Sequence, residues 1–184
     1  MVITLPVARS RSYSLTANVA IVVAGSLMIA ALAQLSVPLW PVPVTGQTLG
    51  VLLVGALLGS RRGSAAVMLY LAEGAVGLPF FASGRAGVAV LAGPTAGYLL
   101  GFVAAAWMIG LITDRGLIRK PAIAAAVMTA ASAAIYLTGC LWLARFVGAD
   151  QVVALGLLPF VTGDVLKIVL AVIVVTLPAQ RYRS

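Results

Sequence analysis

The sequence predicts an all-α integral membrane protein, a single-domain bundle of six transmembrane helices over residues 1–184 with both termini in the cytoplasm. Hydrophobic residues make up 62% of the 184 residues and charged residues only 9%, which is too little charge to solvate the surface of a water-soluble domain. Apolar runs that suit the ~30 Å hydrocarbon layer recur along the chain. The positive charges lie mainly between these runs, and they lie unequally on the two sides of the predicted bundle.

The candidate spans are six apolar runs bounded by Gly, Pro or charged residues. They cover residues 15–37, 45–58, 64–78, 95–112, 121–143 and 157–177. The second and third runs are short and only residues 59–63 separate them, so they are expected to form a tight hairpin of tilted or partly embedded helices. Residues 1–14 are expected to be a cytoplasmic N-terminal segment, because no small-residue cleavage site marks the first span as a removable signal peptide.

The loops that alternate between these spans give the orientation. One side carries Arg9, Arg11, Arg61, Arg62, Arg115, Arg119, Lys120, Arg181 and Arg183. The opposite side carries only Arg85 and Arg145. Loops rich in Lys and Arg stay in the cytoplasm, so both termini are predicted to be cytoplasmic and the protein is predicted to lie in the cytoplasmic membrane.

Small residues spaced four apart allow helices to approach closely in lipid. The fifth span carries such a stripe at positions 122, 126, 130 and 134, and the second span has Gly55 and Gly59. These inner stripes are interpreted as packing surfaces within the bundle. Ala20 and Ala24 form a similar stripe on the first span, and this one is a candidate face for a partner subunit.

Several function classes are excluded by what the sequence lacks. The chain has no histidine and one cysteine, Cys140, so the commonest general base and metal ligand is missing and no intramolecular disulfide forms. It has no Gly-x4-Gly-Lys-Ser/Thr motif for ATP hydrolysis, and no basic patch with interleaved aromatics for nucleic acid. We therefore expect no enzyme activity and no cofactor or metal bound by this chain.

Asp164 and Lys167 are the most informative residues, because ionisable groups within a span are costly unless they are paired or face a cavity. They lie three residues apart and so share one helix face. The favoured interpretation is a polar ligand site, and the alternatives are a purely structural ion pair or, less favoured, a Ser-Lys hydrolase that uses Lys167. Glu73 is less specific, because it lies near the outer end of the third span where headgroups or water would solvate it.

The predicted outer loops add further candidate binding residues. Gln47 and Thr48 follow a proline-rich segment and can form hydrogen bonds with a ligand. The segment 77–98 adds the aromatic rings of Phe81 and Tyr98 and the lone cation of Arg85. A small molecule with an apolar body, a hydrogen-bonding head and a carboxylate would suit this set. The alternative for Trp40, Phe80 and Phe81 is an interfacial aromatic belt.

Four motifs, in order, carry a resemblance to a known family: PVPVTGQTLG at 41–50, GLPFF at 77–81, GPTAGY followed by LLGF at 93–102, and GDVLK at 163–167. Over about residues 33–170 the chain resembles the BioY family, the biotin-binding S components of energy-coupling factor (ECF) transporters. The resemblance implies a six-helix bundle that holds biotin near the extracytoplasmic face. It also implies an energising module, which comprises a transmembrane T subunit and two ATPase subunits that use ATP.

The resemblance also suggests roles for individual residues. Asp164 and Lys167 match the acidic and basic pair of the family's last helix, which contacts biotin, and Ala20 and Ala24 are candidates for the alanine motif that faces the T subunit. Arg85 departs from the glycine or small polar residue typical of the family. An S component for another small vitamin-like carboxylate is the alternative, and neither the orientation of biotin nor transport without the module is decided by the sequence.

Overall fold

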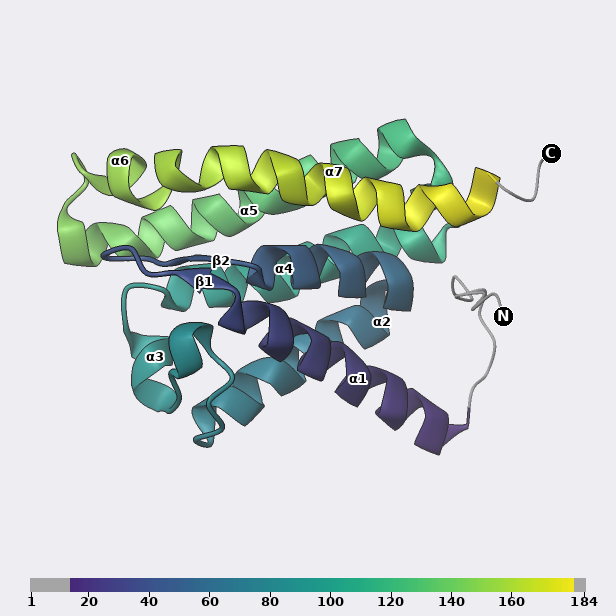
Figure 1. Ribbon diagram of the computed structural model, residues 1–184, viewed down its shortest axis with the longest axis horizontal. Helices are drawn as coiled ribbons and strands as arrows, with labels where there is room; N and C mark the ends of the chain where they lie inside the picture. The colour runs from purple at the N-terminus through teal and green to yellow at the C-terminus, as the bar shows by residue number, and fades with distance from the viewer. Residues whose placement is uncertain (1–13, 181–184) are drawn as a thin grey trace.

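The computed structural model describes residues 14–180 as an almost entirely helical bundle (Figure 1). Its long helices are α1 (Leu15–Gln34), α2 (Gln47–Ala75), α4 (Ala96–Asp114), α5 (Pro121–Val147) and α7 (Leu158–Gln180). Shorter elements connect them: β1 (Ser36–Val37), β2 (Val44–Thr45), η1 (Ala82–Gly84), α3 (Val88–Ala92), η2 (Leu117–Arg119) and α6 (Val152–Gly156). Within the described residues, five helices are long and apolar enough to cross a membrane. The chain is therefore a multi-pass membrane protein.

Helix α2 contains a sharp reversal at Gly59, which has φ 81° and ψ −180° inside an otherwise helical segment. A Cβ on Gly63 would lie 3.1 Å from the Gly55 Cα, whereas residues eight apart in a straight helix are separated by about 12 Å at 1.5 Å per residue. The two halves of α2 thus fold back on each other. The expected break over residues 59–63 is wrong in extent, because the turn needs one residue and the second half is helical from Ser60.

Asp114, at the end of α4, explains why a one-residue turn is sufficient. The Ser60 N–H donates to Asp114 Oδ2 at 3.1 Å and the Ser60 hydroxyl donates to the same oxygen. These bonds satisfy a free amide at the start of the second half of α2, as a capping residue does at an ordinary helix N-terminus. The carboxylate also takes the place of a side chain at position 59, since a Cβ there would overlap with Asp114 Oδ1.

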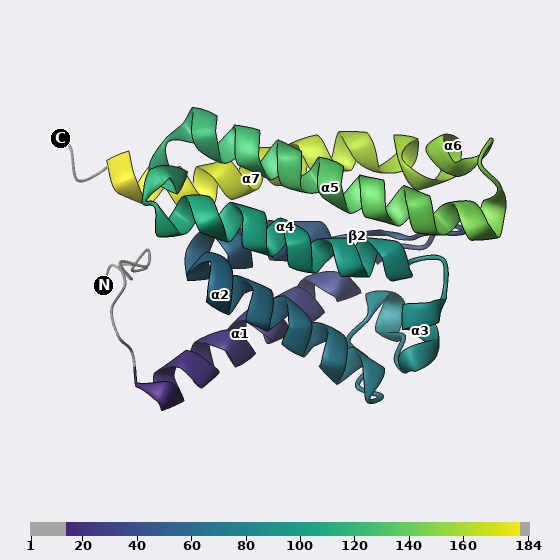
Figure 2. The same ribbon diagram turned by 180° about the vertical axis from the view of Figure 1, so that it is seen from behind.

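The connections divide between the two ends of the bundle. The start of α1, the end of α7, the bend of α2 and the turn between α4 and α5 lie at one end, and the β1–β2 hairpin, α3 and α6 lie at the other (Figures 1 and 2). Residues 1–13 and 181–184 fall outside the described part, and with them all but Ser14 of the predicted N-terminal segment 1–14, as well as Arg9, Arg11, Arg181 and Arg183. The described basic residues Arg61, Arg62 and Arg115 thus lie at the end opposite to Arg85.

Of the small-residue stripes predicted to pack within the bundle, the one on α2 does so and the one on α5 does not. Gly55 packs against α4, where a Cβ would lie 2.8 Å from the Ala106 carbonyl oxygen. The alanine stripe on α5 does not pack inward: Ala122, Ala126 and Ala130 are exposed, so that prediction is wrong. The inward face instead carries Ala124, Met128, Ala131 and Ile135, which are buried where α5 packs against α4.

Candidate functional site

A cavity opens at the end of the bundle that carries the β1–β2 hairpin, α3 and α6. Its empty space, which includes open solvent at its mouth, is about 560 Å³. All seven residues predicted to bind a ligand line it: Gln47, Thr48, Phe81, Arg85, Tyr98, Asp164 and Lys167. They come from α2, the η1 segment, α4 and α7, so the fold brings together residues that are far apart in the sequence.

The polar part of the cavity is built around Asp164 and Lys167 on one face of α7. Lys167 Nζ lies 2.8 Å from Asp164 Oδ1 and donates to Thr48 Oγ1, also at 2.8 Å. The Thr48 hydroxyl lies 3.3 Å from Asp164 Oδ1. The two charges balance, so this cluster is a neutral set of donors and acceptors in a largely apolar bundle. No serine lines the cavity, so the Ser-Lys hydrolase alternative finds no support among the described residues.

Tyr136 on α5 completes this cluster and was missed by the sequence analysis. Its hydroxyl donates to Asp164 Oδ2 at 2.6 Å, so both carboxylate oxygens of Asp164 have partners within the protein. A usable signal exists in the sequence, because a tyrosine in the middle of a span needs a hydrogen-bond partner for its hydroxyl. The partner could not be named, because the register of α5 against α7 is a tertiary property.

Gln47 lines the cavity, but its amide is already engaged by the protein. Its Nε2 donates to the Tyr70 hydroxyl, and its Oε1 accepts from Thr45 Oγ1 at 2.9 Å. Tyr70 in turn donates to the Phe80 carbonyl oxygen at 3.3 Å. The side chain is buried, so Gln47 is held in a fixed position at the start of α2.

Aromatic rings form the apolar wall. Phe81 is only 1% exposed and meets Tyr70 edge to face, with ring centroids 5.7 Å apart. It therefore belongs to the bundle and not to an interfacial belt, whereas Trp40 is 78% exposed. The Tyr98 hydroxyl donates to the Gly156 carbonyl oxygen at 2.8 Å, which ties α4 to α6. Phe160 adds a further ring on α7.

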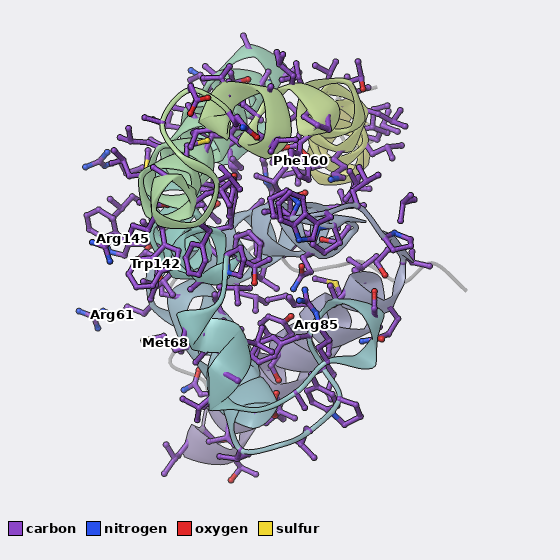
Figure 3. The ribbon with its side chains drawn as sticks, turned by 90° about the vertical axis from the view of Figure 1, so that its left-hand side faces the viewer. Arg61, Met68, Arg85, Trp142, Arg145 and Phe160 are labelled. Carbon is purple, nitrogen blue, oxygen red and sulfur yellow. The ribbon has the colours of Figure 1, made fainter. Side chains whose placement is uncertain are left out.

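Arg85 supplies a second cation. Its Nε donates to the Ala82 carbonyl oxygen at 3.3 Å, and among the described residues the salt bridge found is that of Lys167 with Asp164. Figure 3 looks onto this end of the molecule and shows Arg85 near the middle of the face, with Phe160 above it. The lining thus carries one net positive charge.

The remaining candidate residues lie elsewhere. Glu73 does not line the cavity, and Ala20 and Ala24 are exposed on α1.

The fold and the site together define an integral membrane protein with a cavity of mixed polar and aromatic lining at one end of a helical bundle. A family model described as the BioY family matches residues 6–184. The biotin transporter BioY of Rhodobacter capsulatus is 42% identical over 152 residues, which cover 76% of this chain and 80% of that protein. Biotin transporter BioY2 of Lactococcus lactis is 38% identical over 169 residues, which cover 89% and 88%.

This chain belongs to the BioY family, and the resemblance carried by its four motifs is confirmed. A crystal structure of the S component for biotin from an ECF-type ABC transporter shares the fold, with a TM-score of 0.81, 22% identity and 96% coverage of both chains. The family consists of transporter proteins, so the chain is not an enzyme.

Proposed function

We propose that this protein binds biotin and mediates its uptake as the substrate-specific S component of an ECF-type transporter. The observation that carries the proposal is the cavity, which combines an apolar aromatic wall, a neutral polar cluster and a cation, Arg85, that has no carboxylate partner among the described residues. Biotin has a bicyclic ring system with a ureido group and an apolar chain that ends in a carboxylate, and so presents the complementary groups. The names of the transporters to which the chain is similar support the same ligand.

The charges of the cavity favour one orientation of biotin. The cluster of Asp164, Lys167 and Thr48 is neutral as a whole and offers both donors and acceptors, which suits the uncharged ureido group. Arg85 has no carboxylate partner among the described residues, and its guanidinium is suited to bind the carboxylate of the ligand. The rings of Phe81 and Tyr98 then contact the apolar part between these two ends.

Isothermal titration calorimetry of the purified chain tests this proposal directly. We expect saturable binding of biotin at one site per chain, weaker binding of biotinamide, which lacks the carboxylate charge, and no binding of valerate, which lacks the rings. Tighter binding of a different vitamin carboxylate would assign the chain to another substrate. The absence of biotin binding at any concentration that the protein tolerates would contradict the proposal.

The proposed topology places the chain in the cytoplasmic membrane with six spans and both termini in the cytoplasm. The two halves of α2 count as separate spans because the chain reverses at Gly59. In this orientation the end with Arg61, Arg62 and Arg115 faces the cytoplasm, as the distribution of positive charge requires. The cavity then opens to the outer side.

The proposed partners are a transmembrane T subunit and two ATPase subunits, which use ATP on behalf of this chain. Ala20 and Ala24 lie on an exposed face of α1, while Gly25 and Ile29 on the opposite face pack against α2. The exposed small residues allow a partner helix to approach closely, and we assign the T-subunit contact to this face.

A further inference from the structure

The segment that presents Phe81 and Arg85 to the cavity is a tight loop between α2 and α3. Its backbone closes on itself through a hydrogen bond from the Phe81 N–H to the Arg85 carbonyl oxygen at 3.0 Å and from the Gly84 N–H to the Phe81 carbonyl oxygen at 3.1 Å. Ser83 and Gly84 both have positive φ, 60° and 70°. The loop therefore has a defined shape, and its position in the protein depends on hydrogen bonds from residues outside the loop.

Gln34, the last residue of α1, holds the loop through both ends of its amide. Its Oε1 accepts from the Gly84 N–H at 3.1 Å. Its Nε2 lies within hydrogen-bond distance of three successive carbonyl oxygens, those of Pro79 at 3.3 Å, Phe80 at 3.4 Å and Phe81 at 3.5 Å, and of Ala30 in its own helix at 3.1 Å. The hydroxyl groups of Ser36 and Ser83 add a bond of 3.0 Å beside it.

The two residues that the loop presents are not held equally. Phe81 is fixed independently of Gln34, because its ring packs against Tyr70 and fills the space above Gly74, where a Cβ would overlap with it. Arg85 is exposed, and the hydrogen bond found for its side chain among the described residues stays within the loop, from Nε to the Ala82 carbonyl oxygen. The position of its guanidinium therefore follows the backbone of residues 82–85, which Gln34 anchors at Gly84.

We propose that Gln34 is a positioning residue for the anion-binding end of the cavity: it does not line the cavity, and it acts by holding the loop so that Arg85 reaches the carboxylate of the ligand. This inference rests on the proposed function. It makes α1 part of the site, although α1 contributes no residue to the cavity lining.

The test uses the full chain and the variant Gln34→Met, which keeps a side chain of similar length without hydrogen-bonding groups. We expect biotin affinity to fall about tenfold, which corresponds to about 1.4 kcal/mol, while affinity for biotinamide is unchanged. In an Arg85→Gln background, Gln34→Met should cause no further loss of biotin affinity, because the two residues act through one contact. Gln151→Met is the matched control, since Gln151 is exposed and does not line the cavity.

The ratio of biotin to biotinamide affinity, measured on one preparation, does not depend on the fraction of protein that is folded. An unchanged ratio in Gln34→Met would overturn the inference, whether both affinities stay constant or both fall, because a merely structural role moves the two ligands together. An additive loss in the Arg85→Gln background would also overturn it. Failure of the unaltered chain to bind biotin would instead contradict the proposed function itself, and the inference with it.

Discussion

The ammonium group of Lys167 has two oxygen partners at 2.8 Å, Asp164 Oδ1 and Thr48 Oγ1. A buried ion pair contributes little net stability, because the loss of hydration offsets most of the attraction between its charges. Removal of one partner, in contrast, lowers the stability of the fold, since it leaves the other charge buried and unpaired. The same pair can therefore serve a ligand at little cost to the fold, and substitution can separate the two roles.

The first prediction concerns this pair. Asp164→Asn removes the anionic acceptor and Lys167→Met removes the donor, and each should weaken biotin binding by about 2 to 4 kcal/mol, the order expected for a charge-assisted bond lost in a desolvated site. Calorimetry and thermal unfolding of both variants and of the double variant provide the measurement. Full biotin affinity in the double variant, together with a restored melting temperature, would reduce the pair to a structural role.

The second prediction concerns Tyr136, whose hydroxyl is the partner of Asp164 Oδ2. Tyr136→Phe keeps the ring and leaves this oxygen without its protein donor, so the carboxylate loses its fixed orientation. Biotin affinity should fall by about 1 kcal/mol, the usual net value of one such hydrogen bond. Tyr98→Phe is the control, because its hydroxyl bonds to the Gly156 carbonyl oxygen and not to the cluster. Equal losses in the two variants would contradict a specific role for Tyr136.

For single residues, the sequence predicts which side chains meet in the cavity, but it does not predict the hydrogen-bond partners of their polar atoms. Asp164 and Lys167 can be identified as candidates from the sequence, because a charged residue within an apolar span is costly unless it is paired or faces a cavity. Gln47 carries the same kind of signal, yet its amide is satisfied by Thr45 and Tyr70. Tyr136 and Gln34 gain their roles from contacts between distant segments, which no local pattern encodes.

Among the elements, α2 shows how one residue decides a topology. Gly59 has φ 81° with ψ −180°, a region that is essentially restricted to glycine. The sequence predicts the hairpin from the residues between its two apolar runs, but it overestimates the turn, because the cap that shortens it comes from Asp114 on α4. The short elements β1, β2, α3 and α6 are likewise stabilised by tertiary contacts, and propensity alone does not predict them.

The third prediction follows from this turn. Gly59→Ala combines an unfavourable backbone conformation with a Cβ that would overlap with Asp114 Oδ1, and it should lower the free energy of unfolding by about 3 kcal/mol. Gly116→Ala is the control: Gly116 also has positive φ, 72°, but a Cβ there would meet nothing within 4 Å, so about 1 kcal/mol is expected. Chemical unfolding in detergent compares them. Equal effects would show that Asp114 does not determine the turn.

The two ends of the molecule differ, because one carries most of the described basic residues and the other carries the cavity. The fourth prediction tests the membrane orientation that we derive from this difference. An accessibility tag beside Arg119, in the turn between α4 and α5, should be protected in intact cells, and a tag beside Arg145, at the end of α5, should be accessible from outside. The reason is that Arg119 lies at the end with most of the described basic residues, whereas Arg145 lies at the end with the cavity. Equal accessibility of both tags would contradict the proposed orientation.

The fifth prediction concerns assembly. Ala20→Trp and Ala24→Trp place a bulky ring on the exposed face of α1, far from the cavity, so they should prevent co-purification with a T subunit while biotin affinity of the isolated chain stays unchanged. Ala122→Trp, on the exposed face of α5, is the control. Intact complexes with both α1 variants would assign the partner contact to a different surface.

The length of the first half of α2 sets the depth at which the cavity lies. From Gln47 to the turn at Gly59 the helix rises by only about 18 Å at 1.5 Å per residue, against a hydrocarbon layer of about 30 Å. In the proposed orientation, with the turn at the cytoplasmic surface, the first half of α2 would end about 12 Å short of the outer boundary of that layer, and the cavity, which Gln47 and Thr48 at the start of α2 line, would lie below that boundary. A molecule bound there would lie below the plane of the lipid headgroups, where bulk water no longer screens its charge.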